Sequence, residues 1–358
     1  MIDYTPINLL REQVGLFSEM QKICSDIPGA DKMTPMSIID GFTYNKASIN
    51  PKVIDRLVNS FISGMNRIDK TYTKYLCSDD RTFNTELRDA FIFPLILEEW
   101  SKAKQVFKPD ADFADALLHT NKLCITSNMI DHLPYNLFYI DLSSCEYFSP
   151  IDGVFVFIKK YDNIASINLY TVTKSLTYFS FYLNGPFDKH GCLNIDLSEL
   201  ANVYYDNIWK PILFDTVTED VSQIKISRKT VNVFALQLIA YLSIEKPQLT
   251  ESDLTKNTYK KPSAVSKVKN KWSEIRIQDV GIKYGTDFRK AVTKYKQENI
   301  ENNTTSKRKS PIPHFRCAHW HKFWVGKGRK ELQLMWIEPI FVGNGESKDV
   351  IIHKVKKD

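Results

Sequence analysis

Four short segments between residues 136 and 185 constrain the fold of this chain more than any other feature. They read NLFYIDLSS, GVFVFIKKY, SINLYTVT and TYFSFYLNG, and each is rich in β-branched and aromatic residues. Turn signals such as SPIDG and DNIA separate them. Because strands that follow one another at such short spacing pair in antiparallel order, the segments predict a four-stranded β-meander.

Helical patterns lie on both sides of the predicted meander. The first 120 residues read mainly as helix, and between Val53 and Met65 the apolar residues recur on one helical face. A further helical stretch is predicted between Pro109 and Pro134. After the meander, VNVFALQLIAYLSIEKPQL is too apolar for a surface helix and predicts a buried one. These patterns together predict an α+β fold.

The charge is distributed unevenly along the 358 residues. Residues 255–358 hold 24 Lys and Arg against 10 Asp and Glu, a net charge of +14, whereas the whole chain carries +6. The remaining 254 residues therefore carry −8. This asymmetry predicts that the C-terminal part meets an acidic partner such as RNA, although a solvated lysine-rich surface is an equal alternative.

Two further features indicate the compartment. No run of eighteen apolar residues occurs, so we expect no membrane partner. The six cysteines form no CxxC pair, which is typical of buried thiols in a reducing cytoplasm.

Residues 313–324, PHFRCAHWHKFW, hold three of the seven histidines and two of the six tryptophans. If this stretch is a strand, its side chains alternate between two faces. One face then holds Phe315, Cys317, His319, His321 and Phe323, and the other holds Arg316, Ala318, Trp320, Lys322 and Trp324. VGKGRK turns the chain and ELQLMWIEPIFVG returns, which brings Trp336 beside the first strand. We therefore predict a C-terminal β-ribbon docked on the meander or the buried helix, with its tryptophans partly exposed.

The two histidines of the ribbon, His319 and His321, permit three roles. His319 and His321 have the spacing of a metal-binding pair, with Asp141, Glu338 and His353 as candidate third ligands. Alternatively the imidazoles hydrogen-bond to neighbouring strands or line a binding groove. The chain has no Gly-rich phosphate loop, nucleophile elbow or HExxH helix, so we predict a binding protein with no catalytic residues, metal or cofactor.

The ribbon also carries a resemblance. Its residues Pro313, His314, Arg316, His319, Trp320, His321, Trp324, Gly326, Trp336 and Phe341-Val342 resemble the C-terminal signature of the second-described type V-A anti-CRISPR family. Leu133-Pro134, Tyr139, Asp141 and Ser143 resemble an upstream segment of that family, and the apolar helix ending at Glu245 and Pro247 is a weaker match. One departure is that Cys317-Ala318 stand where the family has Arg-Gly.

The resemblance implies an anti-CRISPR regulator that is not an enzyme and acts in the cytoplasm of a bacterial host. Members bind the N-terminal segment of the nascent type V-A effector nuclease and lower its production through loss of its mRNA. Ribosome or mRNA contact is a further expectation, and the oligomeric state stays open. The alternatives are a nucleic-acid-binding protein of a mobile element and a metal-dependent nuclease that uses His319 and His321.

These readings assign two groups of candidate residues. The predicted partner-binding residues are His314, Arg316, His319, Trp320, His321, Trp324 and Trp336. The predicted nucleic-acid-binding residues are Lys307, Arg308, Lys309, Lys327, Arg329 and Lys330.

The same patterns divide the chain into five segments. They are a mainly helical region 1–130, the meander and buried helix 131–249, a basic connector 250–312 with room for one strand and one helix, the ribbon 313–346 and a basic tail 347–358.

Overall fold

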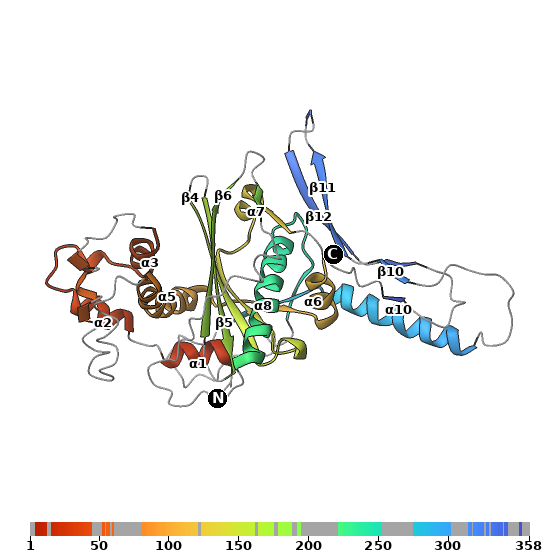
Figure 1. Cartoon of the computed structure of the whole chain (residues 1–358), viewed down its shortest axis with the longest axis horizontal. Helices are drawn as coiled ribbons and strands as arrows, with labels where there is room; N and C mark the ends of the chain where they lie inside the picture. Colours follow the sequence, from red (N-terminus) through yellow and green to blue (C-terminus); the bar gives the residue numbers. More distant parts are fainter. Residues whose placement is uncertain are drawn as a thin grey trace, which may run out of the picture.

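The computed structural model has an α+β fold, which confirms the predicted class. It describes residues 4–12, 16–44, 52–53, 55–57, 59–60, 81–120, 123–161, 164–174, 178–187, 192–194, 221–252, 275–301, 314–316, 318–325, 327–328, 331–338, 340–342 and 351–352. Helices lie on both faces of a central mixed sheet, and the C-terminal strands extend away from it (Figure 1).

The central sheet has seven strands in the order β6-β5-β4-β3-β1-β9-β8. Four of them are the predicted meander: β3 (Leu137–Asp141), β4 (Ile151–Tyr161), β5 (Ile164–Thr173) and β6 (Tyr178–Pro186). Each pairs with the next in antiparallel register, so the meander prediction is confirmed. The other three are β1 (Gln105–Pro109), β9 (Arg276–Val280) and the short β8 (Leu249–Glu251), with β1 parallel to both β3 and β9.

Strand β1 lies within the first 120 residues, which were predicted to be mainly helical, and was not itself predicted. It lies between two other strands of the sheet, and Val106 and Phe107 are fully buried. Strand β9 and helix α10 (Ile282–Glu301) occupy the stretch where one strand and one helix were predicted, and β9 joins the same sheet. The division of the chain into five segments stays a prediction.

The N-terminal helices pack on one face of the sheet around a core that includes Trp100, Tyr139 and Phe155. These helical elements are α1 (Thr5–Glu12), α2 (Leu16–Ile23), η1 (Ala30–Lys32), α3 (Pro35–Tyr44) and α5 (Arg81–Ala103). Val53 and Leu57, from the predicted helical face, are helical and buried. Phe61, Ile62 and Met65 lie outside the described residues.

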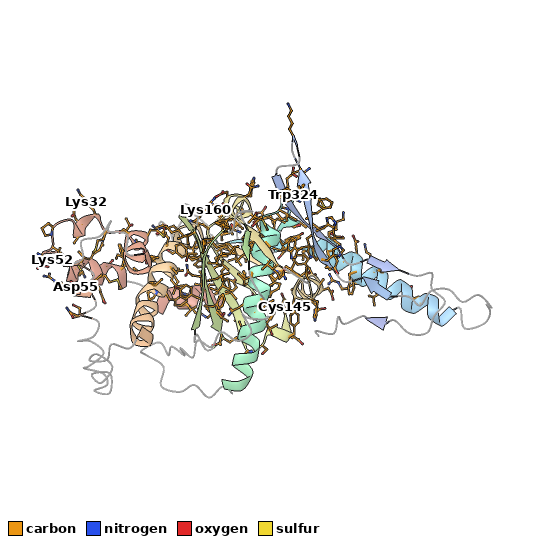
Figure 2. The ribbon with its side chains drawn as sticks, turned by 45° about the horizontal axis from the view of Figure 1, so that its top comes forward. Lys32, Lys52, Asp55, Cys145, Lys160 and Trp324 are labelled. Atoms are coloured by element: carbon orange, nitrogen blue, oxygen red, sulfur yellow. The ribbon has the colours of Figure 1, made fainter. Side chains whose placement is uncertain are left out.

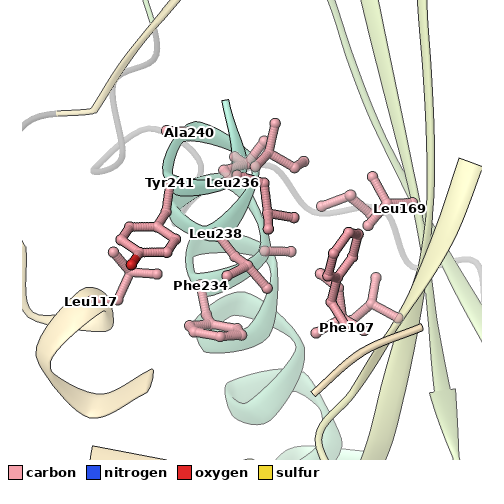
Figure 3. Close-up of a cluster of buried hydrophobic side chains, with 14 of the residues drawn as sticks. Phe107, Leu117, Leu169, Phe234, Leu236, Leu238, Ala240 and Tyr241 are labelled. Carbon is pink, nitrogen blue, oxygen red and sulfur yellow. The ribbon is translucent and has the colours of Figure 1, made fainter. Parts of the chain in front are cut away.

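Helix α8 (Val221–Leu242) packs on the opposite face of the sheet. Its residues Phe234, Leu236 and Leu238 are fully buried and lie between the sheet and α6 (Ala111–Leu118), as Figure 3 shows. The predicted buried helix is therefore confirmed. No helix in the described part of the chain is long and apolar enough to cross a membrane.

The helical stretch predicted between Pro109 and Pro134 is wrong in one respect, because it is interrupted. Helix α6 ends at Leu118, strand β2 (Cys124–Thr126) pairs with β7 (Cys192–Asn194), and α7 (Ser127–Asp131) follows. The side chain of Thr126 accepts a hydrogen bond from the N–H of Met129 and so begins α7. A threonine that caps a new helix cannot also continue the previous one, since the N-cap has extended backbone angles.

The single strand predicted over residues 314–324 is divided between two sheets. Strand β10 (His314–Arg316) pairs with β13 (Ile340–Val342) and β14 (Ile351–Ile352). Strand β11 (His319–Val325) pairs with β12 (Glu331–Ile337) to form the predicted ribbon. Ala318, between β10 and β11, is buried in the core beside α8, and the chain passes from one sheet to the other there.

Candidate partner-binding ribbon

The two strands of the ribbon are paired so that their tryptophans lie opposite one another. Trp320 pairs with Trp336, and His321 pairs with Met335. The predicted return of Trp336 beside the first strand is thus confirmed. Directly opposed residues of antiparallel strands project from the same face, so the two indoles share one face while His321 and Met335 share the other.

Trp336 fixes the base of the ribbon to the body. It is 6% exposed, and its ring makes edge-on contacts with Phe113, Tyr241 and Tyr284 at centroid distances of 5.3, 5.6 and 5.6 Å. Its indole N–H donates to the Thr120 hydroxyl at 3.2 Å. The expectation that Trp336 is partly exposed is therefore wrong, because three helices supply the aromatic pocket that covers it.

Trp320 is half-buried and is held by α8. Its indole N–H donates to the side-chain carbonyl of Gln237 at 2.5 Å, and the Gln237 amide donates to the backbone carbonyl of Thr120 at 2.9 Å. Both indoles therefore attach to the same pair, Gln237 and Thr120. We did not predict these two residues, although Gln237 stands out as the lone amide in the apolar run VFALQLIAYL.

A second set of hydrogen bonds holds the C-terminal end of β12, at the base of the ribbon. The Gln248 side chain donates to Glu338 at 3.4 Å and accepts from the Tyr284 N–H at 3.3 Å, while its own backbone N–H donates to the Tyr241 hydroxyl at 3.1 Å. Burial is the main cause that raises the pKa of both Tyr241 and Tyr284, so neither phenol ionises near neutral pH. The ribbon base is thus fixed by uncharged aromatic side chains.

The face of the ribbon that carries His319, His321, Phe323, Met335 and Ile337 is named the outer face here. His319 and His321 are exposed, as are Phe323 at 37% and Met335 at 45%. The rings of His321 and Phe323 lie 4.2 Å apart and form a continuous aromatic surface. The outer face is therefore an exposed apolar patch with two imidazoles, which is the composition of a protein interface.

The described residues do not supply a metal centre for His319 and His321. No group of three or more His, Cys, Asp or Glu within that part of the chain is placed to hold a metal ion. Of the candidate third ligands, Asp141 accepts hydrogen bonds from Tyr4 and Ser143, and Glu338 accepts from Gln248. His353 lies outside the described residues.

The free end of the ribbon carries Trp324 and Lys327. Trp324, labelled in Figure 2, is 52% exposed. Lys327 in the turn is exposed as well. His314 and Arg316 belong to β10 and not to the ribbon. The other predicted nucleic-acid-binding residues, Lys307, Arg308, Lys309, Arg329 and Lys330, lie outside the described residues.

The ribbon and the sheet that supports it fall within one matched region. A family model described as AcrVA2-like, the anti-CRISPR type V subtype A2 family, matches residues 107–344. The match runs from β1 through the meander and α8 to the end of the ribbon. No curated protein matches the chain.

Proposed function

The chain belongs to the AcrVA2-like family of type V subtype A2 anti-CRISPR proteins, and we propose that it binds the N-terminal segment of the nascent type V-A effector nuclease. The membership confirms the resemblance in the sequence. The protein therefore has an anti-CRISPR function, and its partner belongs to a CRISPR system. In this proposal the bound nascent chain leads to loss of the effector mRNA, and the protein acts by binding, not as an enzyme, in the cytoplasm of a bacterial host.

The outer face of the ribbon is the observation that carries the proposal. Phe323 and Met335 expose apolar surface beside the His321 ring, and soluble proteins rarely leave such surface together unless it binds something. Aromatic side chains are enriched among the residues that dominate binding energy. An extended polypeptide can also pair its backbone with a strand edge while its side chains contact this face.

The docked tryptophans give this face a fixed geometry. Trp336 and Trp320 are held by the Thr120 and Gln237 hydrogen bonds, so the ribbon does not have to order itself when the partner arrives. Such preorganisation lowers the entropy cost of binding. Trp320 and Trp336, both predicted partner-binding residues, therefore support the binding face from behind, and Phe323 and Met335 are the better probes of direct contact.

Nucleic acid is the second class of partner. Lys327, Arg329, Lys330 and the connector residues Lys307, Arg308 and Lys309 are proposed to contact ribosomal RNA or mRNA, since clustered cations bind phosphates. The net charge of +14 in residues 255–358 supports this contact. It also supports the alternative function, a nucleic-acid-binding protein of a mobile element, which would bind RNA or DNA without any effector polypeptide.

A capture assay tests the polypeptide proposal. Purified full-length protein is titrated against a labelled peptide from the effector N-terminus, in parallel with the Phe323→Ala variant. Removal of a central aromatic contact is expected to weaken capture about 30-fold, from a loss of roughly 2 kcal/mol. Ile164→Ala is a matched control because Ile164, at the start of β5, is also an exposed apolar residue.

Transcript abundance provides the second readout. During co-expression in bacteria, effector mRNA should fall with the wild-type protein and with Ile164→Ala, and should stay high with Phe323→Ala. The proposal is wrong if the wild-type protein captures no effector peptide and the transcript level remains constant. Salt-sensitive RNA binding without peptide capture would favour the mobile-element alternative.

A further inference from the structure

Strand β11 has an edge that no described strand covers. It pairs with β12 along its whole length, from His319 to Val325, and the two strands form a sheet of their own. Among the described residues, the backbone of 321–325 makes no hydrogen bond outside the ribbon. Because a strand directs its backbone N–H and C=O groups alternately to its two sides, this edge presents donors and acceptors to a further strand.

The edge also lacks the features that commonly protect an exposed strand. Such strands are often interrupted by a bulge or a proline. The β11 segment, HWHKFWV, contains no proline, and its register with β12 is continuous. Lysine is its one permanently charged residue. A regular edge of this kind is a template on which another extended chain can pair.

Exposed rings flank this edge on both faces of the ribbon. Phe323 on the outer face is 37% exposed, and its neighbour Trp324 on the opposite face is 52% exposed. On β12 the described neighbours differ, because Met335 is 45% exposed whereas Trp336 is 6% exposed and docked on the body. A ligand that lies on one face contacts only one of the two β11 rings. A strand paired with the edge places its alternate side chains beside both.

We propose that an extended polypeptide segment binds along the free edge of β11 as a third strand of the ribbon. This inference rests on the proposed function for the identity of the polypeptide, the N-terminal segment of the effector nuclease, and it adds where and how that segment binds. A row of alternating amide donors and acceptors matches another peptide backbone, whereas the backbone of a nucleic acid offers acceptors at its phosphates.

The edge also defines the chemistry of the segment. It pairs with 321–325, so it is about five residues long, with no proline where its N–H groups donate to β11. One row of its side chains lies over the outer face, beside the rings of His321 and Phe323, which are 4.2 Å apart. The other row lies beside Trp324. Both rows are apolar, because they cover exposed aromatic rings.

N-methylation of the peptide backbone tests the pairing. Fluorescence anisotropy with the full-length protein and labelled peptides from the effector N-terminus first locates the shortest segment that binds. N-methyl groups are then placed one at a time along it, which removes a single N–H donor and leaves every side chain in place. Affinity should fall about tenfold at alternate positions and stay within about twofold at the positions between, because only alternate amides of a strand face its neighbour.

Two protein variants test the two faces. Trp324→Ala should weaken peptide capture about tenfold, as Phe323→Ala also does, although the two rings lie on opposite faces. Ile164→Ala is again the matched control, and its affinity should stay within about twofold of wild type. Equal melting temperatures of all four proteins establish that the ribbon is intact.

Hydrogen exchange of individual amides locates the edge. In the complex, the amides of 321–325 that face away from β12 should exchange about tenfold more slowly or slower still, because they now donate to the added strand. The amides of β12 that face away from β11 should exchange at the same rate as in the free protein.

Any of three results would overturn the inference: capture that is insensitive to N-methylation, wild-type affinity in Trp324→Ala, or protection of the outer edge of β12 in place of β11. Each of them leaves the proposed function intact, since the effector peptide is still captured. If no effector peptide is captured, the proposed function fails instead. The edge is then tested with a synthetic peptide of sequence ELQLMWI, which pairs with β11 within the ribbon. Protection of the outward amides of 321–325 by that peptide supports the inference, and unchanged exchange overturns it.

Discussion

Replacing Gln237 by leucine should loosen the ribbon and lower the free energy of unfolding by about 3 kcal/mol. Gln237 is fully buried, and its amide group both accepts from the Trp320 indole at 2.5 Å and donates to the Thr120 carbonyl at 2.9 Å. Leucine is of similar size but can make neither bond. Each buried polar group left without a partner costs roughly 1–3 kcal/mol. Because Trp320 is half-buried and its indole N–H can reach water, the cost of leaving that N–H without a partner lies at the lower end of this range.

Urea titration, followed by circular dichroism, measures the loss of stability. A double-mutant cycle with Trp320→Phe, which lacks the indole N–H, isolates the contribution of that hydrogen bond. In the Trp320→Phe background the cost of Gln237→Leu should fall by roughly 1–2 kcal/mol. Asn232→Leu on the same helix is a matched control, since the Asn232 amide accepts from Thr171 of the central sheet.

Two outcomes would refute the reasoning. A loss of stability below about 0.5 kcal/mol would mean that the amide of Gln237 does not hold the ribbon, because surface substitutions have effects of that size. Strict additivity with Trp320→Phe would mean that the two side chains are not coupled. In either case the docked orientation of the ribbon would require another cause.

Other substitutions probe the same support. Gly281→Ala should lower the melting temperature and reduce the free energy of unfolding by roughly 3 kcal/mol. Gly281 has a φ of 72°, which alanine rarely adopts. An added Cβ would also lie 2.2 Å from the ring of Phe113, which contacts Trp336. Asp110→Ala should cost about 1–2 kcal/mol in urea titration, since Asp110 caps α6 and pairs with Arg289, whereas Asp110→Asn should retain most of the capping. Burial raises the pKa of the Cys145 thiol to about 11, so the unfolded state ionises first as the pH rises. The thiol's contribution to stability is then complete below about pH 8 and decreases by roughly 2–3 kcal/mol towards pH 11, a decrease that Cys145→Ala should lack in pH-dependent unfolding.

The meander and the ribbon could be predicted because each depends on residues close in sequence. Strands β3 to β6 follow one another with short turns, and β11 and β12 are separated by a short turn, so local alternation and turn residues are sufficient. Strand β1 could not be predicted in this way. Its five residues, QVFKP, show no alternation, and its partner β9 lies some 170 residues further along the chain, as the pairing of Gln105 with Arg276 shows. Only the tertiary fold brings such a strand between two others.

The three ribbon tryptophans show the same limit for the candidate site. Trp320, Trp324 and Trp336 have similar local patterns, yet one is half-buried, one is exposed and one is buried. Their burial depends on Phe113, Gln237 and Tyr284, which come from three separate helices. Strand alternation predicts which ribbon residues share a face, but it contains no information on which part of that face meets the body.

The docked ribbon exposes two opposite surfaces, the outer face and the part of the other face that carries Trp324. Trp320 and Trp324 lie on the same face of one strand, four residues or about 13 Å apart along it. This face is docked on the body at Trp320 and is exposed at Trp324. Beyond this point the outer face and the face that carries Trp324 lie on opposite sides of the two-stranded ribbon. A nascent polypeptide and the message that encodes it are joined through the ribosome. Under the function proposed above, a ribbon that holds the nascent polypeptide would therefore meet the message at a high effective concentration, and two modest contacts would be sufficient to select a message during its translation.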